Sequence, residues 1–506
     1  MQRDPQEKDF QNHIIAELGK QGWLVGESRE YNKKFAIYEP DLWAWIEATQ
    51  PDKLERLKTR GASWREDVLK RLDDELEKKG TLMLLRKGFQ FAGAGNIQLS
   101  QAEPEDDRNE KVRSNFEANR LRVVPELVYS VKTAENSLFT TATDNSFNRI
   151  DLVFFINGLP VATVELKSVF TQTLEDAKEQ YRTTRLPIDK ARHKEPLLTN
   201  KRGAIVHFAM TEEEIEMTTK LDGQNTFFLP FNQGNNGHKG NPPIANGNQY
   251  PTFYFWKIVC QPQNWLRIFH SFVYWEVKRK VDAYSEHHDD SRLIFPRYHQ
   301  FDAVTKMLSD CKAQGAGHNY LCEHSAGSGK TSTIAWTAHG LTKLRTSTGD
   351  PYFHSTIVIT DRTVLDAQLQ EAITQIDHQD GLIAAINNED KAQVGKSKSQ
   401  QLEEALLSAK PIIIVTIQTF PFVMEAILTN TSLNNRRFAV IIDEAHNSQT
   451  GSTASKLQAT LSLQSQQEMA NLTIEELLEK IQQARVQSKN ISYFAFTATP
   501  KHSTYM

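Results

Sequence analysis

Cysteine and long apolar runs are scarce in this sequence. Its 506 residues include only three cysteines, and these lack the paired spacing of a metal site: Cys260, Cys311 and Cys322. This usage excludes a disulfide-rich secreted domain and fits a reducing compartment. No run of about 18 apolar residues occurs, which excludes a membrane-spanning helix. The first residues hold no apolar stretch, so we expect a cytoplasmic protein without a signal peptide.

An excess of positive charge is also absent. The formal net charge is −4, with 24% charged and 39% hydrophobic residues, as in an ordinary globular protein. This balance does not exclude DNA as a partner, because a DNA enzyme can confine its basic residues to one groove. The length of 506 residues predicts two to four domains.

A glycine-rich loop lies between an apolar run and a helix-like segment. Residues 323–331 read Glu-His-Ser-Ala-Gly-Ser-Gly-Lys-Thr and follow the apolar run 320–322. Backbone N–H groups of such a loop meet the positive end of a helix dipole, so the pattern predicts a phosphate cradle. The Lys330 ammonium is expected to reach the β and γ phosphates of ATP, and the Thr331 hydroxyl to bind Mg²⁺. His324 replaces the first glycine of the usual pattern, and an ordinary Gly/Ser loop is the alternative.

Apolar strands alternate with helical stretches after residue 318, which predicts a parallel α/β sheet. The strand-like run 438–443 ends in adjacent acidic residues. Asp443 can hold the Mg²⁺ that bridges ATP phosphates, and Glu444 can orient and deprotonate the attacking water. A buried strand with a solvated acidic end is the alternative, and the preceding phosphate loop weakens it.

Two further motifs accompany these strands. A Thr-Ala-Thr-Pro turn follows the run 494–496, and Thr497 and Thr499 are expected to couple the phosphate state to a DNA track. The Gln300 amide can read adenine, with Arg297 or an aromatic residue stacked nearby. An ordinary Thr-Pro turn and a surface helix start are the alternatives. The predicted ATP-binding residues are Arg297, Gln300, Ser325, Ala326, Gly327, Ser328, Gly329, Lys330 and Thr331.

In the N-terminal half, two apolar runs flank an Asn-Gly turn at residues 157–158, which predicts a β-hairpin. Asp151 lies near the base of the first strand, while Glu165 and Lys167 share one face of the second. Two carboxylates can hold Mg²⁺, and the lysine can support a water nucleophile for phosphodiester cleavage. This Asp-x₁₃-Glu-x-Lys pattern is loose, so a solvated hairpin face is an equal alternative.

The C-terminal motifs resemble the first motor lobe of superfamily 2 helicases and translocases. More narrowly, they resemble the motor (restriction) subunit of type I restriction–modification enzymes. The residues that carry this likeness are Arg297 to Gln300, His324 to Thr331, Asp361, Arg362, Asp443 to His446, Ser448, Gln449, Gly451 and Thr497 to Thr499. The resemblance implies a RecA-like lobe that binds ATP and Mg²⁺.

The hairpin from Asp151 to Lys167 resembles the PD-(D/E)xK nuclease core of the same family, although Ile150 stands where proline is usual. The resemblance implies that Asp151 and Glu165 bind the Mg²⁺ of a nuclease and that both act in catalysis with Lys167.

The helix-like segment 174–182 follows the hairpin. Its Gln180 and Tyr181 approximately fit the family's Gln/Tyr motif, which adds both to the implied catalytic set. A predicted amphipathic helix over 7–22 resembles the opening helix of the nuclease, and either Glu7 or Glu17 could support the metal site. Elsewhere the pattern predicts an exposed charged loop over 101–114, a strand over 226–229 and helices over 263–310.

The likeness implies three parts: an endonuclease domain over 1–250, a helical connector over 251–290 and a first motor lobe over 291–506. A second motor lobe, which supplies an arginine finger in such enzymes, has no counterpart before residue 506. We therefore expect a fragment of a longer subunit that binds ATP weakly and does not translocate DNA.

The expected function is ATP-dependent translocation of double-stranded DNA with Mg²⁺-dependent cleavage of unmodified DNA. The expected partners are the methyltransferase and specificity subunits of a type I complex. Two alternatives stay open: another superfamily 2 nuclease–helicase in DNA repair or phage defence, and a non-catalytic remnant that binds DNA or a partner protein.

Overall fold

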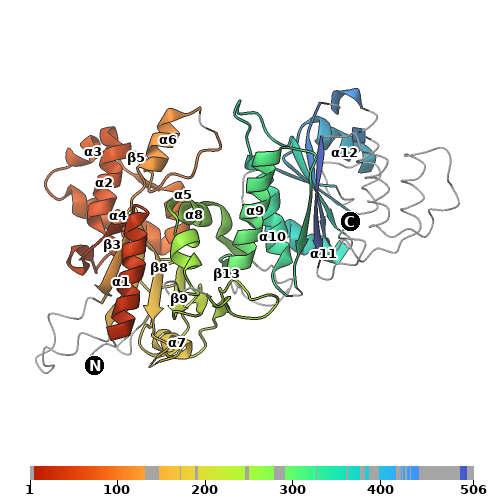
Figure 1. Cartoon of the computed structure of the whole chain (residues 1–506). Coiled ribbons are helices and arrows are strands. Elements are labelled where there is room, and N and C mark those ends of the chain that lie inside the picture. The colour runs from red at the N-terminus through yellow and green to blue at the C-terminus, as the bar shows by residue number, and fades with distance from the viewer. Residues whose placement is uncertain are drawn as a thin grey trace, which may run out of the picture. The chain divides into compact units, whose positions relative to one another are not determined.

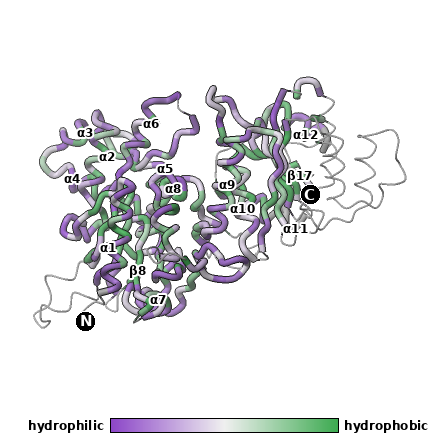
Figure 2. The backbone as a smooth tube through the Cα atoms, in the orientation of Figure 1, coloured by the Kyte–Doolittle hydropathy of each residue, from purple (hydrophilic) through white to green (hydrophobic). Residues whose placement is uncertain are grey.

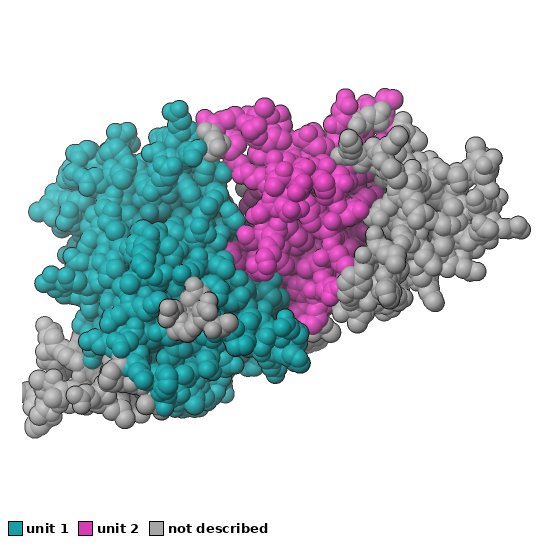
Figure 3. All heavy atoms as spheres, in the orientation of Figure 1, with its two compact units in different colours: residues 1–104, 109–273, 293–299 teal, residues 105–108, 274–292, 300–506 magenta. Residues whose placement is uncertain are grey.

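The structure is a computed structural model that describes most of the chain. It covers residues 5–106, 108–130, 148–170, 172–188, 192–244, 250–277, 291–325, 327–360, 363–376, 382–386, 398–416, 423, 426–427, 430–433, 435–443 and 490–497. The chain divides into two compact units, drawn in teal and magenta in Figure 3. The first unit holds residues 1–104, 109–273 and 293–299, and the second holds residues 105–108, 274–292 and 300–506.

The first unit contains a seven-stranded mixed sheet in the order β1-β6-β7-β8-β9-β10-β11 (Figure 1). The pairs β1–β6 and β8–β9 are parallel, and the other neighbours are antiparallel. Its elements are α1 (Pro5–Lys20), β1 (Leu24–Val25), β2 (Tyr31–Asn32), β3 (Ile37–Tyr38), α2 (Glu39–Thr49), α3 (Pro51–Lys58), α4 (Trp64–Lys79), α5 (Thr81–Lys87), β4 (Phe89–Phe91), β5 (Gly95–Ile97), α6 (Glu110–Glu117), β6 (Leu121–Val128), β7 (Arg149–Ile156), β8 (Leu159–Leu166), α7 (Leu174–Thr183), β9 (Val206–Met210), β10 (Ile215–Thr218), β11 (Leu229–Pro230), the π-helical η4 (Phe255–Val259), α8 (Pro262–Arg267) and the π-helical η5 (Ile268–Phe272).

Strands β7 and β8 form the predicted hairpin, joined by the two-residue Asn157-Gly158 turn. Both turn residues have positive φ, 49° and 86°, which is the conformation that an Asn-Gly pair adopts at low cost. Every residue of β8 is buried, so this hairpin lies in the middle of the sheet rather than at an edge. The prediction of a hairpin is confirmed.

Both faces of the sheet in the first unit carry apolar packing. Strand β7 contributes to both, because its neighbouring residues point to opposite sides. On one face, Phe155 packs in a core cluster with Ala177 and Tyr181 of α7. On the other face, the Phe154 ring packs edge-on against Phe255 and lies at a tilt to Trp265. The segment 250–273 therefore packs within the first unit, and the predicted boundaries at 250 and 290 stay a prediction.

The second unit contains a six-stranded sheet in the order β14-β19-β18-β15-β17-β16, in which all pairs are parallel. This confirms the predicted α/β class and is consistent with a RecA-like lobe. The elements that follow η5 are β12 (Tyr274–Val277), β13 (Ser291–Ile294), α9 (Tyr298–Gln314), β14 (Asn319–Glu323), α10 (Lys330–Lys343), β15 (Ser355–Thr360), α11 (Thr363–Ile376), β16 (Ile383–Ala385), α12 (Lys398–Leu407), β17 (Ile412–Thr416), β18 (Phe438–Asp443) and β19 (Ile491–Thr497).

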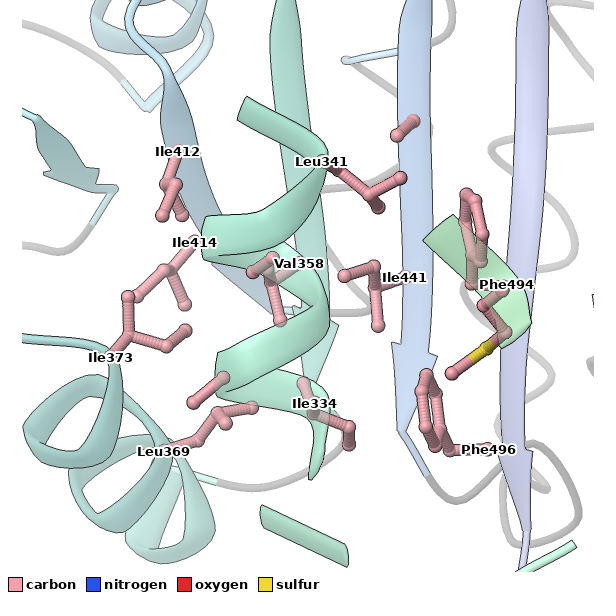
Figure 4. Close-up of a cluster of buried hydrophobic side chains, with 14 of the residues drawn as sticks. Ile334, Leu341, Val358, Leu369, Ile373, Ile412, Ile414, Ile441, Phe494 and Phe496 are labelled. Atoms are coloured by element: carbon pink, nitrogen blue, oxygen red, sulfur yellow. The ribbon is translucent and has the colours of Figure 1, made fainter. Parts of the chain in front are cut away.

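Two hydrophobic clusters cover the two faces of this parallel sheet. Val358 of β15 packs with Ile334 of α10 and Ile373 of α11, as Figure 4 shows. Ile357, its neighbour on β15, packs on the opposite face with Leu402 of α12. Strands buried on both faces read as continuous apolar runs, and the hydrophobic colour near the label β17 in Figure 2 reflects this.

The sequence predictions were wrong at three local points. Residues 110–117 form helix α6, because Asn109 caps the helix by accepting a hydrogen bond from the Val112 N–H, so the predicted loop over 101–114 ends before them. The predicted strand over 226–229 is reduced to the pair Leu229–Pro230, and the predicted helices over 263–310 are interrupted by β12 and β13. None of the helices in the described part of the chain is long and apolar enough to cross a membrane.

We expect Gly158→Ala to destabilise the first unit more than Gly237→Ala does. Both glycines have a φ of 86°. A Cβ atom on Gly158 would lie 2.5 Å from the Tyr38 carbonyl oxygen, whereas one on Gly237 would meet nothing within 4 Å. The left-handed backbone costs alanine about 1–2 kcal/mol at either position, and the overlap at Gly158 adds about 1–3 kcal/mol. Urea denaturation followed by tryptophan fluorescence measures both costs, and equal losses would contradict the prediction.

Candidate active sites

Two carboxylates face each other across strands β7 and β8. The register pairs Leu152 with Val164, so the next residues along the ladder, Asp151 and Glu165, lie opposite each other on one face. Both side chains are buried, with 2% and 0% of their surface exposed. The Leu166 N–H donates to Asp151 Oδ2 at 2.7 Å. The hairpin therefore brings together the two acids that the sequence placed fourteen residues apart.

Glu165 has one oxygen occupied and one open. The Arg185 Nε–H donates to Glu165 Oε1 at 2.6 Å, while Glu165 Oε2 has no hydrogen-bond partner in the described part of the chain. Burial raises the pKa of Glu165 to about 7, the Arg185 guanidinium acts against this rise, and the Asp151 carboxylate adds to it. Burial and the nearby Asp151 carboxylate both disfavour ionisation of Glu165. A cation bound beside Glu165 would therefore be favourable.

Lys167 lies directly beyond β8, two residues after Glu165, and its side chain is buried. Its Nζ donates to the Leu166 carbonyl at 2.7 Å and lies 3.3 Å from Glu7 Oε2. Gln11, one helical turn further along α1, donates from Nε2 to the Asp151 carbonyl oxygen at 2.7 Å. Helix α1 therefore contacts both the lysine and the strand that carries one of the acids.

Glu7 and Glu17, the two predicted supports of the metal site on α1, occupy different faces of this helix. Glu7 is buried against Lys167, whereas Glu17 pairs with Lys20 at 2.5 Å and Lys257 at 3.4 Å. Lys20 is the first cause of the lowered pKa of Glu17. Only Glu7 therefore lies beside the residues of the predicted nuclease site.

Helix α1 is held in place by the segment that follows the sheet. The Phe10 ring packs edge-on against Trp256, with ring centroids 5.9 Å apart. The Gln21 side chain donates to the Trp256 carbonyl, and the Trp23 indole donates to the Cys260 carbonyl, each at 2.7 Å. These contacts fix the direction of the helix that presents Glu7.

Gln180 and Tyr181 lie on α7, beside the same face of β8. The Tyr181 hydroxyl is 2.8 Å from Thr163 Oγ1, two residues before Glu165 on the strand, and the ring is fully buried. His207 Nδ1 lies 2.7 Å from the same Thr163 hydroxyl. Gln180 Oε1 is buried without a hydrogen-bond partner among the described residues. The structure thus places the Tyr181 ring in a hydrophobic core cluster with its hydroxyl against Thr163, and the catalytic roles of Gln180 and Tyr181 stay predictions.

The donor set fits a lightly coordinated Mg²⁺. Among the residues that the structure describes, no group of three or more His, Cys, Asp or Glu could hold a metal ion. Two carboxylates are enough for Mg²⁺, which keeps several of its own waters and takes one or two protein carboxylates. The facing pair of Asp151 and Glu165, with the open Glu165 Oε2, meets that requirement.

In the second unit, the predicted motor residues meet at one edge of the parallel sheet. Strand β14 ends at Glu323, β18 at Asp443 and β19 at Thr497. Glu323 pairs with Thr497, and Asp443 pairs with Phe496. The carboxyl edge of a parallel α/β sheet is the usual place for ligands. The parallel register therefore gathers motifs that are more than a hundred residues apart in the chain.

The glycine-rich loop joins β14 to helix α10 at this edge. Gly327 and Gly329 have φ angles of 74° and 85°, and Gly329 caps the helix that begins at Lys330. Lys330 Nζ lies 3.1 Å from Asp443 Oδ1. The half-buried Thr331 is the second residue of α10, at the positive end of the helix dipole. The loop lysine and the acidic strand end, predicted separately, are therefore in contact.

His324, which replaces the first glycine of the usual loop, is buried and bridges three elements. Its Nδ1 contacts the Ser328 hydroxyl, and its Nε2 lies 3.0 Å from Thr333 Oγ1 on α10. Its backbone N–H donates to the Thr497 carbonyl at 2.7 Å. The imidazole thus ties the tip of the loop to the helix, and the backbone ties the loop to the end of β19.

Gln300 is also connected to the loop. Its Nε2 donates to the Gly329 carbonyl at 2.9 Å, and its side chain is buried. Arg297 is half-buried in the short segment before α9, where burial lowers the pKa of its guanidinium. Ala326, Glu444 and Thr499 lie outside the described residues, as do Asp361 and Arg362.

Sequence reasoning missed Arg185 and Gln11. Arg185 is twenty residues beyond Glu165 and follows the end of α7, and no spacing rule pairs it with a strand residue. Gln11 lies one turn after Glu7 on the buried face of α1, which is the only signal that could have suggested it.

Two family models match the chain. Residues 5–226 match the model described as the type I restriction enzyme R protein N terminus, and residues 299–504 match the SWI2/SNF2 ATPase model. No curated protein matches the chain by sequence.

Solved structures also match parts of the chain. One is the ATP-dependent type ISP restriction-modification enzyme LlaBIII bound to DNA, with 17% identity, a TM-score of 0.27, and 43% of this chain aligned to 14% of that one. Another is the DUF1998 helicase MrfA, with 14% identity, a TM-score of 0.25, and 40% of this chain aligned to 27% of that one. The chain thus covers about a seventh and a quarter of these two structures.

We expect His207 to make the first unit less stable as the pH falls below 6.5. Burial lowers the pKa of His207 to about 3, from its ordinary value of 6.5. Between these values the unfolded chain binds a proton that the folded chain does not, so stability falls by up to about 1.4 kcal/mol per pH unit. Urea denaturation at pH 7.5 and 5.5 should show a smaller loss for His207→Gln than for the parent chain.

Thr163→Val is the control, because it removes the hydroxyl beside His207 Nδ1 and keeps the imidazole. This variant should be less stable at both pH values and should keep the pH-dependent loss. An unchanged pH dependence in His207→Gln would show that this histidine is not the titrating group.

Proposed function

This chain joins a type I restriction enzyme R protein N-terminal region to a SWI2/SNF2 ATPase region, and we propose that it acts as the restriction subunit of a type I restriction–modification system. Its first unit would cleave phosphodiester bonds of unmodified DNA with Mg²⁺, and its second unit would bind ATP for translocation along double-stranded DNA. The buried, facing carboxylates of Asp151 and Glu165 beside Lys167, within the matched N-terminal region, carry this proposal.

In the nuclease reaction, Asp151 and Glu165 would hold the metal through their carboxylate oxygens. A bound Mg²⁺ would supply Lewis-acid activation of the scissile phosphate and a water of lowered pKa. The Lys167 ammonium would orient the attacking water by donating hydrogen bonds to it, and Glu7 Oε2 lies 3.3 Å from that ammonium. Gln11 fixes the backbone of Asp151. Helix α1 therefore positions the lysine and the first acid together.

In the ATPase reaction, the loop between β14 and α10 cradles the phosphates with its backbone N–H groups. Lys330 would pair with the β and γ phosphates, Thr331 and Asp443 would hold the Mg²⁺ that accompanies ATP, and Glu444 would activate the attacking water. The bond from the His324 N–H to the Thr497 carbonyl connects the loop to the strand end expected to couple ATP to DNA. Gln300 and Arg297 take part in binding the nucleotide base.

The proposed partners are double-stranded DNA and the methyltransferase and specificity subunits of a type I complex. Reading of the target sequence belongs to those subunits, since the chain shows no motif for base recognition.

We expect Asp151→Ala and Lys167→Ala each to lower Mg²⁺-dependent nicking of supercoiled plasmid by about a hundredfold or more, because each removes a group that acts on the reacting atoms. Glu7→Ala should cost about tenfold, as the loss of a partner that orients an active-site group does. Rates of nicking by the purified chain at saturating Mg²⁺ measure these losses.

Glu17→Ala is the matched control, since it removes a half-buried glutamate of the same helix whose partners are Lys20 and Lys257 rather than Lys167. Its rate should equal that of the parent chain. Background activity that persists unchanged in both Asp151→Ala and Lys167→Ala would favour the non-catalytic alternative.

We expect Lys330→Ala to weaken binding of a fluorescent MgATP analogue by about tenfold or more, because the phosphates lose their side-chain cation. Lys306→Ala provides the control, because this lysine pairs with Asp302 on the solvent face of α9 and its side chain is 76% exposed. Equal affinity in the two variants would argue against a nucleotide site at this loop.

A further inference from the structure

A buried arginine is bonded directly to one of the proposed metal ligands. Arg185 has 5% of its surface exposed, and its Nε–H donates to Glu165 Oε1 at 2.6 Å. The other oxygen, Glu165 Oε2, has no hydrogen-bond partner among the described residues. The two oxygens of this carboxylate therefore differ: Oε1 accepts a hydrogen bond from Arg185, and Oε2 is buried without a partner among the described residues.

Arg185 is itself fixed by the end of helix α7. Its backbone N–H donates to the Gln180 carbonyl, and its Nη1 donates to Thr184 Oγ1 at 3.2 Å. Thr184 is the C-cap residue that follows α7. The guanidinium is thus anchored on a rigid element and reaches across to β8, as a residue that orients a metal ligand must be.

We propose that Arg185 is a positioning residue that holds Glu165 by Oε1, so that Oε2 is the single oxygen offered to the metal shared with Asp151. This inference rests on the proposed nuclease function. A carboxylate held at one oxygen binds a metal through the other, which leaves coordination positions for water and a DNA phosphate.

The charge of Arg185 has an opposite effect, because a guanidinium near a metal site repels the cation. Two features favour positioning as the dominant effect. Without Arg185, Glu165 would keep both oxygens unpaired in a fully buried site, and a freed carboxylate could rotate away from Asp151. Three carboxylates, those of Glu7, Asp151 and Glu165, also outnumber the two cations Lys167 and Arg185, so the cluster still attracts a divalent ion.

Mn²⁺ binding to the full 506-residue chain without nucleotide tests this role, with free Mn²⁺ followed by its EPR signal. The component that Asp151→Asn removes defines the site. We expect Arg185→Met to weaken that component by about 10–100-fold, and Arg185→Lys to recover part of it. In plasmid nicking, Arg185→Met should need more Mn²⁺ for half-maximal rate and lose less at saturation.

Arg202→Met is the matched control. Arg202 is equally buried, donates to the Phe35 carbonyl at 2.7 Å and pairs with Asp73. Its loss should lower stability to a similar extent and leave Mn²⁺ affinity unchanged, which separates positioning from a general effect on folding. Thermal denaturation of each variant measures that stability.

The outcomes separate the two proposals. Mn²⁺ binding in Arg185→Met that equals or exceeds that of the parent chain would overturn the role of Arg185 and leave the nuclease site standing. If Arg185→Met does not fold, parent-like affinity in Arg185→Lys would overturn it instead. A parent chain without any component that depends on Asp151 would overturn the nuclease site, and the inference with it.

Discussion

The buried carboxylates of Asp151 and Glu165 repel each other, and the groups that contact them in the first unit offset this repulsion. The turn at residues 157–158 pairs Ile156 with Leu159. A bulge between Phe154 and Phe155 then shifts the register of β7 and β8 by one residue, and this shift brings Asp151 opposite Glu165. A buried charge needs partners, and here they come from four places in the chain: the Leu166 N–H, Arg185, Lys167 and, through Lys167, Glu7. The remaining imbalance of charge supports the proposed uptake of a divalent cation.

In the second unit, the parallel order of the strands brings the site residues together. Parallel strands all end at one edge, so polar residues that follow distant strands are gathered without individual contacts to guide them. Lys330 and Asp443 meet in this way. His324 then adds specific bonds to Ser328, Thr333 and the backbone of Thr497, which make the loop, the helix and β19 one connected structure. His324, which stands in place of the usual glycine, therefore connects the loop to the helix and to β19.

Sequence patterns predicted the parts of both sites that depend on local rules. The Asn-Gly turn and strand alternation predicted the hairpin with Glu165 and Lys167, and the loop pattern predicted the helix start at Lys330. The same patterns missed helix α6, where a capping Asn109 outweighed the charged, loop-like composition. Within the predicted connector over 251–290, Phe255 and Trp265 pack on the sheet beside Phe154, and the boundaries of that connector stay a prediction.

By itself, the sequence determined the class of each unit and the hairpin, because period, turn chemistry and motif spacing act over short stretches of chain; the roles of the candidate site residues stay predictions. Only the tertiary structure shows that Glu7, rather than Glu17, lies beside Lys167, since this depends on the face that α1 turns toward the lysine, and packing against Trp256 sets that face. It also revealed Arg185, because contact between a loop and a strand twenty residues earlier is a property of the folded sheet. In the sequence, the two carboxylates form only a loose Asp-x₁₃-Glu-x-Lys spacing. In the fold they are a buried pair, and Glu165 Oε2 has no hydrogen-bond partner among the described residues. Only burial and strand register create this arrangement.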